Sequence, residues 1–198
     1  MTNRKIVLTG GPCAGKTTLA AMLARAFPNL VENVPEAASL LFSGGFPRFP
    51  NQEAQRAVQR AVFATQHELE AAYSAHFPDR VLVLDRGTVD GAAYWPEGAE
   101  AFFSSMGTNL ERELGRYEAV IYLESAAELD YALHKTKNPH RKESWTEAAR
   151  LDAVTFNLWS KHPRFLFIRN NRSFSRKVSD VLSAVSASLP IGETREPK

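Results

Sequence analysis

The chain has 198 residues, a length typical of one domain, and its 44% content of hydrophobic residues is enough to fill one sizeable core. Its 24 basic and 22 acidic residues leave a net charge of only +2, which excludes the global positive field that draws proteins to nucleic acid or to membrane surfaces. No apolar stretch approaches the length of a membrane span or of a signal-peptide core. We therefore expect a cytoplasmic protein with neither a nucleic-acid nor a membrane partner.

Apolar runs alternate along the chain with segments of helical period, which is the pattern of an α/β fold with a parallel sheet covered by helices on both faces. The apolar runs predict five strands, at residues 5–10, 30–35, 80–85, 119–124 and 164–168. The helical spacing predicts helices at residues 15–27, 36–42 and 51–77, and one more after each of the last two strands. The end of the chain has no apolar period, so we expect a single domain over residues 1–189 and a flexible tail over residues 190–198.

A glycine-rich stretch, TGGPCAGKT, lies between the first predicted strand and the first predicted helix. It fits the pattern G-x-x-x-x-G-K-[ST] in the context that this pattern requires, which favours a phosphate-binding loop over a structural glycine turn. In such a loop the backbone N–H groups hold polyphosphate oxygens, the lysine reaches the β and γ phosphates, and the threonine hydroxyl binds Mg²⁺. We therefore expect ATP and Mg²⁺ as cofactors, bound by Gly10, Gly11, Pro12, Cys13, Ala14, Gly15, Lys16, Thr17 and Thr18.

Acidic side chains follow two other predicted strands. Asp85 and Arg86 stand at the end of the run VLVLDRG, and Glu36 stands just past the strand that precedes the second helix. Ligands of an open α/β sheet bind at the carboxyl ends of its strands, so these groups should converge on one crevice. There Asp85 would hold the magnesium shell through water, and Arg86 would meet phosphate.

Four strings resemble, in order and spacing, the family of P-loop ATPases and kinases known as AAA-type ATP/NAD kinase-like domains: GGPCAGKT, VPEAASL, DRGTVDGAAY and NPHRKES. The chain is similar to the ribosylnicotinamide kinase domain of bacterial NAD regulators and, more distantly, to deoxynucleoside and nucleoside monophosphate kinases. The resemblance extends from about Ile6 to about Lys177. It implies a P-loop NTPase fold with a kinase-like lid.

The resemblance also implies roles for residues outside the phosphate-binding loop. Glu36 would face the acceptor and take its proton, although an acidic residue here also suits the start of a helix, and Glu32 is a weaker rival. In the basic segment HKTKNPHRKE, Arg141 would neutralise charge on the transferred phosphoryl group, the alternative being a solvated basic loop. With Lys16 and Asp85, these two residues complete the predicted catalytic set.

The remaining candidates contact the acceptor or the base. In the related nucleoside kinases the long helix lines the acceptor pocket, so Arg56 and Gln66 are candidate substrate contacts, although a solvent-facing polar stripe is the commoner explanation of their spacing. Asp90 would hold the wall of the site or touch the acceptor. Arg86 is a further candidate substrate contact. Asn170 would lie at the base of the nucleotide, although asparagine is also an ordinary turn residue.

These observations favour an ATP-dependent phosphotransferase that acts on a small metabolite, with nucleosides and nucleotides as first candidates. The alternative is an ATP- or GTP-binding NTPase switch that has no small-molecule acceptor. A kinase should have a deep second pocket beside the γ-phosphate with Glu36 directed toward it, whereas a switch should have a surface that rearranges with the γ-phosphate. The identity of the acceptor and the oligomeric state stay open at this point.

Overall fold

Five parallel strands form the centre of the molecule in the computed structural model, which describes residues 3–11, 14–125, 144–170 and 174–186. The strands are β1 Lys5–Gly10, β2 Val31–Val34, β3 Val81–Asp85, β4 Ala119–Leu123 and β5 Phe165–Ile168. Their order in the sheet is β2-β3-β1-β4-β5, which confirms the predicted five-stranded parallel sheet. The predicted tail at residues 190–198 lies outside the described residues.

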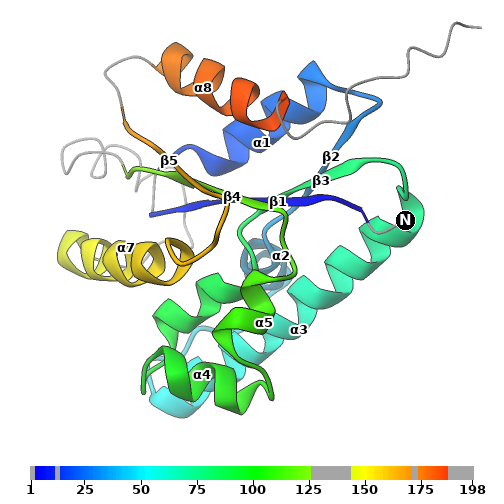
Figure 1. The fold of residues 1–198 in the computed structure, drawn as a ribbon. Coiled ribbons are helices and arrows are strands. Elements are labelled where there is room, and N and C mark those ends of the chain that lie inside the picture. The colour runs from blue at the N-terminus through cyan, green and yellow to red at the C-terminus, as the bar shows by residue number, and fades with distance from the viewer. Residues whose placement is uncertain (1–2, 12–13, 126–143, 171–173, 187–198) are drawn as a thin grey trace, which may run out of the picture.

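Helices cover both faces of the sheet (Figure 1). Helices α1 and α8 lie on one face, and the helices α2, α3, α4, α5 and α7 lie on the other, together with a short 3₁₀ helix, η1. Their bounds are α1 Lys16–Ala26, α2 Ala37–Ser43, α3 Gln52–His76, η1 Thr88–Tyr94, α4 Ala99–Ser105, α5 Leu110–Leu114, α7 Trp145–Trp159 and α8 Phe174–Ser186. Within the described ranges, no helix has the length and apolar character needed to cross a membrane.

Alternate residues of the strands feed two apolar cores, one on each face of the sheet. In β1, Ile6 and Leu8 pack with residues of α1 and α8, whereas Val7 packs on the opposite face with Phe102 of α4 and Trp159 of α7. All five of these side chains are completely buried. Burial on both faces explains why the central strands are nearly continuous apolar runs in the sequence.

The pairing of the strands brings the predicted site residues to one edge of the sheet. Leu8 of β1 lies in register with Asp85 at the end of β3, and Gly10 lies in register with Leu123 at the end of β4. The loop that follows β1 therefore emerges between the ends of β3 and β4. This position is the one in which parallel α/β sheets bind their ligands.

The long helix α3 begins where the sequence predicts, because the Asn51 side chain accepts a hydrogen bond of 2.8 Å from the backbone N–H of Ala54. Its polar stripe, however, does not face solvent throughout. Gln66 is only 3% exposed and Glu70 is completely buried. The explanation of Gln66 as part of a solvent-facing stripe is therefore wrong.

Glu70 is buried because a set of donors surrounds its carboxylate. It accepts hydrogen bonds from Lys5 at 3.1 Å and Arg116 at 2.6 Å, and also from the Tyr117 hydroxyl and the Gln66 amide. A buried carboxylate is stable only when such partners compensate for lost hydration. The network joins α3 to β1 and to the turn before β4.

The segment between β3 and β4 forms η1, α4 and α5, none of which the sequence pattern predicts. These helices have seven, seven and five residues, which is too few for a helical period to be recognised. Their apolar side chains nevertheless complete one core, as the burial of Phe102 and Phe103 shows. Within this segment, η1 contacts both α3 and α7.

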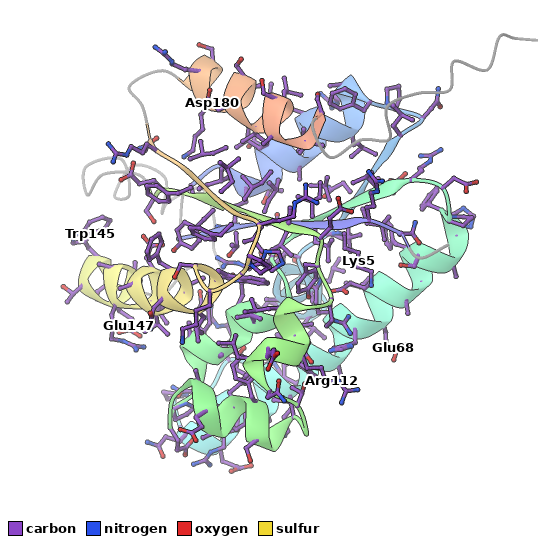
Figure 2. The ribbon with its side chains drawn as sticks, viewed as in Figure 1. Lys5, Glu68, Arg112, Trp145, Glu147 and Asp180 are labelled. Carbon is purple, nitrogen blue, oxygen red and sulfur yellow. The ribbon has the colours of Figure 1, made fainter. Side chains whose placement is uncertain are left out.

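Replacement of Glu70 by glutamine should lower the free energy of unfolding by about 3 kcal/mol, or roughly 6–12 °C in Tm, because Lys5 would lose its buried counter-ion and Arg116 would keep only Glu113, at 3.5 Å. Urea unfolding followed by circular dichroism measures this change. Glu68→Gln is the matched control, since Glu68 lies on the exposed side of the same helix (Figure 2) and should change stability by less than about 0.5 kcal/mol. Equal stabilities of the two variants would contradict a structural role for the Glu70 network.

Candidate active site

The loop after β1 approaches the neighbouring strand too closely for side chains. Gly10 and Gly15 have positive φ angles of 130° and 88°, a region that favours glycine. A Cβ atom on Gly10 would lie 2.1 Å from the carbonyl oxygen of Leu123 in β4, and one on Gly11 would lie 1.9 Å from the Ser125 hydroxyl. Both contacts are shorter than atoms can tolerate, so the backbone of β4 requires glycine at position 10, and the side chains of Ser125 and Asp152 favour it at position 11. Pro12 and Cys13 lie outside the described residues.

Lys16, the first residue of α1, lies across this loop. Its ammonium group donates hydrogen bonds to the carbonyl oxygens of Gly10 at 2.9 Å and Gly11 at 2.8 Å, and the residue is 8% exposed. Burial, with a further contribution from the charge of Arg86, lowers the pKa of Lys16 from its ordinary 10.5 to about 8, although Asp85 opposes the change. The loop thus holds a buried cation that has hydrogen bonds but no paired anion at bonding distance among the described residues.

Thr17 and Asp85 meet at the junction of α1 and β3. The Thr17 hydroxyl donates to Asp85 Oδ2 at 2.6 Å, whereas the buried Asp85 Oδ1 has no hydrogen-bond partner among the described residues. Burial raises the pKa of Asp85, and the nearby charge of Glu36 adds to the rise, while Lys16 counteracts it. A carboxylate oxygen without a donor, close to the oxygen of the Thr17 hydroxyl, fits hydrated Mg²⁺, which prefers oxygen ligands and keeps several waters.

Arg86 adopts an uncommon backbone conformation at the end of β3. Its φ angle of 72° is the one positive value among the described residues other than glycine, and its N–H donates to the carbonyl oxygen of Leu8 at 3.0 Å. Its side chain donates from Nε to Glu36 at 2.7 Å and from Nη1 to Asp90 at 2.7 Å. Strained residues of this kind cluster at functional sites.

Glu36 is the residue that directly precedes α2. Its surroundings keep its carboxylate ionised. Burial by itself raises its pKa, but the charge of Arg86 and a hydrogen bond from the Ser39 hydroxyl outweigh burial, so the pKa of Glu36 lies below its ordinary value. The carboxylate consequently accepts hydrogen bonds at neutral pH and is a weak base. Its chemistry suits the orientation of a donor such as a hydroxyl group.

Asp90 is saturated by donors from the protein. Its two carboxylate oxygens accept hydrogen bonds from Arg86, the Thr9 hydroxyl at 2.7 Å, the Gly87 N–H at 3.0 Å and the Trp159 indole at 3.1 Å. The residue is 4% exposed. Of the two roles that the sequence leaves open, this geometry supports the one in which Asp90 holds the wall of the site, because it fixes Arg86.

A large cleft of about 780 Å³ opens beside this group, between α2, α3, η1 and α7. Glu36, Arg86 and Asp90 lie in its wall, and a small void of about 20 Å³ beneath them reaches Gln66. The large cleft is lined by Glu36, Ala38, Ser39, Phe42, Arg48, Phe49, Pro50, Gln55, Val58, Gln59, Val62, Arg86, Asp90, Gly91, Tyr94, Trp95, Pro96, Glu147, Arg150 and Leu151.

The remaining residues that the sequence predicts for the site do not lie together in the large cleft. Arg56 pairs with Glu53 and Glu97, and it is not one of the described residues that line the large cleft. Asn170 follows β5, where its backbone N–H donates to Glu124 at 2.6 Å. Arg141 lies outside the described residues. Ala14 is buried in the loop and Thr18 is exposed on α1.

Sequence reasoning missed Glu147 and Arg150, which bring α7 into the wall of the large cleft. They form a bidentate ion pair, with nitrogen to oxygen distances of 3.0 and 2.8 Å. A charged pair three residues apart on a helix is common on protein surfaces, so the sequence contains no signal of its position. Only the packing of α7 against η1 and the sheet reveals it.

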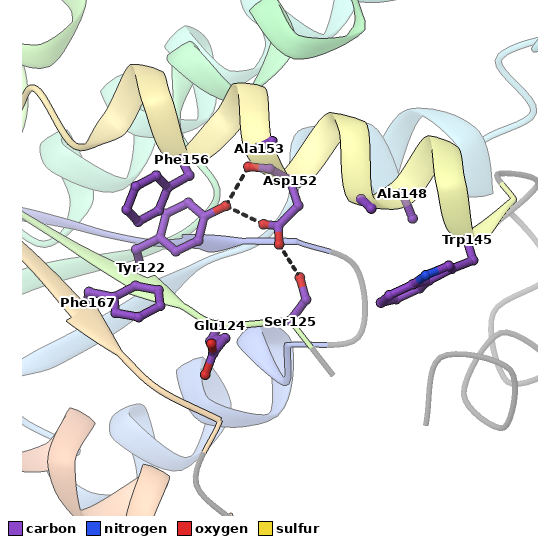
Figure 3. A pocket seen from close by; sticks show the side chains of 10 residues that line it. Tyr122, Glu124, Ser125, Trp145, Ala148, Asp152, Ala153, Phe156 and Phe167 are labelled. Carbon is purple, nitrogen blue, oxygen red and sulfur yellow. Dashed lines mark hydrogen bonds between the residues drawn. The ribbon is translucent and has the colours of Figure 1, made fainter. Parts of the chain in front are cut away.

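The opposite face of α7 lines a second cleft, the aromatic cleft of about 400 Å³ against β4 and β5 (Figure 3). Asp152 is directed toward Tyr122 and Ser125, and its carboxylate accepts hydrogen bonds from both hydroxyls, that from Ser125 at 2.7 Å. The same carboxylate packs against Gly11, since a Cβ atom there would lie 2.6 Å from the Asp152 carboxyl carbon. Asp152 therefore supports the loop from the side away from α1.

Comparison with known families places this geometry in context. A model of an AAA domain matches residues 5–177, and the chain belongs to this family. No curated protein matches the sequence significantly.

Two solved structures share the fold of the chain. Thymidylate kinase from Candida albicans has a TM-score of 0.70 at 14% identity, covering 94% of this chain and 92% of the other. Deoxyadenosine kinase from M. mycoides has a TM-score of 0.64 at 12% identity, covering 93% of this chain and 100% of the other. The chain therefore shares the fold of these two kinases, as the sequence predicts, whereas the predicted lid at residues 134–143 lies outside the described residues.

The lowered pKa of Lys16 predicts a pH dependence of stability in the ligand-free protein. Between about pH 8 and pH 10.5 the unfolded chain binds a proton at Lys16 that the folded chain has lost, so the free energy of unfolding gains a contribution that rises with pH. In Lys16→Met this contribution is missing. Relative to that variant, the parent should gain up to about 3 kcal/mol across this interval in urea titrations.

Lys161→Met is the control for this measurement, because Lys161 is an exposed lysine after α7. Its stability should follow that of the parent at each pH. A constant difference between the parent and Lys16→Met from pH 7.5 to pH 10 would contradict a buried, destabilised ammonium group at Lys16.

Proposed function

We propose that the protein is an ATP-dependent phosphotransferase that moves the γ-phosphoryl group of ATP to a hydroxyl group of a small metabolite in the large cleft. One observation carries this proposal. The loop with Lys16 and the ion pair of Glu36 with Arg86 belong to one site, in which the charges of Arg86 and Glu36 both act on Lys16. A phosphate site that adjoins a separate cleft with a carboxylate in its wall is what transfer to an acceptor requires.

The residues of the chain divide the work of phosphoryl transfer. Backbone N–H groups of the loop and Lys16 hold the β and γ phosphates, for which Lys16 exchanges its bonds to the Gly10 and Gly11 carbonyl oxygens. Thr17 and Asp85 hold Mg²⁺, which when bound neutralises charge on the phosphate oxygens. A bound polyphosphate also gives Lys16 the anionic partner that it lacks at bonding distance.

Glu36 and Arg86 act on the acceptor side. The transition state of phosphoryl transfer is loose, so the acceptor hydroxyl needs orientation more than early deprotonation. An ionised Glu36 held by Arg86 and Ser39 accepts the hydrogen bond of that hydroxyl in a fixed direction. Its lowered pKa is compatible with this role, because the proton moves only as the new phosphorus–oxygen bond forms.

Glu36→Gln tests this assignment. The variant keeps the shape of the side chain but loses its charge, so Mg-ATP should bind nearly as well as to the parent while transfer to the acceptor slows by about 10²–10⁴-fold. Glu32→Gln is the matched control, since Glu32 lies in β2, pairs with Arg80 at 2.7 Å and should leave transfer unchanged. Transfer at the parental rate by Glu36→Gln would reduce Glu36 to a residue that starts α2.

Asp85→Asn should have a different effect, because it weakens the site proposed for Mg²⁺. We expect weaker binding of Mg-ATP as well as slower turnover, whereas binding of ATP in the presence of EDTA should change little. Isothermal titration with and without Mg²⁺ separates the two quantities. An equal loss of affinity in both titrations would show that Asp85 supports the loop itself and not the metal.

A further inference from the structure

The charged side chains that line the large cleft balance one another. Its described lining contains three arginines, Arg48, Arg86 and Arg150, and three carboxylates, Glu36, Asp90 and Glu147. The cleft therefore carries no excess of positive charge on the described residues. Possible acceptors differ in charge, because some already carry a phosphate group and others do not. The charge of the cleft therefore helps to distinguish between them.

Carboxylates already bind two of the three arginines. Arg86 lies between Glu36 and Asp90 at 2.7 Å from each, with 14% of its side chain exposed. Arg150 is held by both oxygens of Glu147. The third, Arg48, has its guanidinium group 4.7 Å from the centre of the Phe42 ring, in a cation–π contact.

An acceptor monophosphate would meet an unfavourable environment here. Its phosphate carries between one and a half and two negative charges at neutral pH, and such groups are recognised by arginines that can offer both N–H groups to them. Arg86 already donates from Nε to Glu36 and from Nη1 to Asp90, so a phosphate that bound its remaining N–H groups would approach two carboxylates of the same sign. It would do so beside the polyphosphate of the donor, whose charge has the same sign.

The rest of the lining suits an uncharged ring. Four aromatic side chains line the large cleft: Phe42, Phe49, Tyr94 and Trp95. The amides of Gln55 and Gln59, both in α3, line the same cleft. Aromatic faces stack on flat rings, and an amide offers a donor and an acceptor to ring nitrogen and oxygen atoms. The lining thus combines aromatic faces with polar groups that can orient a ligand, as small-molecule sites do.

We infer that the acceptor is an uncharged alcohol that carries a flat heterocyclic ring, of the nucleoside class, and not a nucleoside monophosphate. The inference rests on the proposed function. The acceptor hydroxyl oxygen bonds to the γ-phosphorus while the bond from that phosphorus to the β,γ-bridging oxygen breaks. The bonding pair leaves with ADP, and the hydroxyl proton passes to Glu36 and from there to solvent.

A panel of nucleosides and their own 5′-monophosphates, presented with Mg-ATP, tests this inference. Release of ADP and the mass of the product identify phosphorylation of each compound. We expect at least one nucleoside to become a monophosphate, with a kcat/KM at least about tenfold above that of the matching 5′-monophosphate. Phosphorylation of monophosphates in preference to nucleosides overturns the inference and leaves the proposed function standing. Phosphorylation of neither class, with Mg-ATP binding intact, overturns the inference, and failure of a wider panel of hydroxyl-bearing metabolites in the same assay would overturn the proposed function.

A charge variant provides a second test in the same assay. Glu147→Gln releases Arg150 from its counter-ion and gives the lining an excess positive charge, so the ratio of kcat/KM for the monophosphate to that for the nucleoside should rise by about twofold to fivefold. Glu111→Gln makes the same change of charge on the exposed side of α5 and should leave the ratio unchanged. Equal ratios in the parent and both variants would contradict discrimination by the charge of the large cleft.

Discussion

The ion pairs of Arg86 with Glu36 and Asp90 fix the arrangement of the site, because they join the end of β3 to the start of α2 and to η1. Arg86 accepts a backbone conformation that costs of order 1–3 kcal/mol. The two ion pairs and the hydrogen bond from its N–H to Leu8 offset this cost. Loss of the guanidinium would leave two carboxylates without a counter-ion, so the conformation of one residue constrains three elements.

The electrostatics of the site follow from the same arrangement. Burial lowers the pKa of Lys16, with a contribution from Arg86, and burial raises the pKa of Asp85, with a contribution from Glu36. Each group is thus destabilised in its charged form in the ligand-free protein. Under the proposed function, a polyphosphate beside Lys16 and a divalent cation beside Asp85 would relieve both, and perturbed pKa values of this kind favour a functional site.

Helix α7 connects the two sides of the molecule that adjoin the loop. One face places Asp152 against Gly11 and holds it with Tyr122 and Ser125. The other face places Arg150 in the wall of the large cleft. A shift of this helix would therefore change the support of the loop and the shape of the cleft together.

The sequence by itself determined the five strands, the glycine-rich motif between β1 and α1 and the position of Asp85 at a strand end, because strand period and loop motif depend on residues that are neighbours in the chain. The sequence also predicted Glu36 as a site residue, but it did not predict the ion pair of Glu36 with Arg86. Tertiary structure decided that Arg86, fifty residues away, binds Glu36. It also decided that Glu70 is buried and that Arg150 reaches the cleft. Whether a polar helical residue faces solvent or a partner depends on what packs against it, and contacts between distant segments leave no period in the sequence.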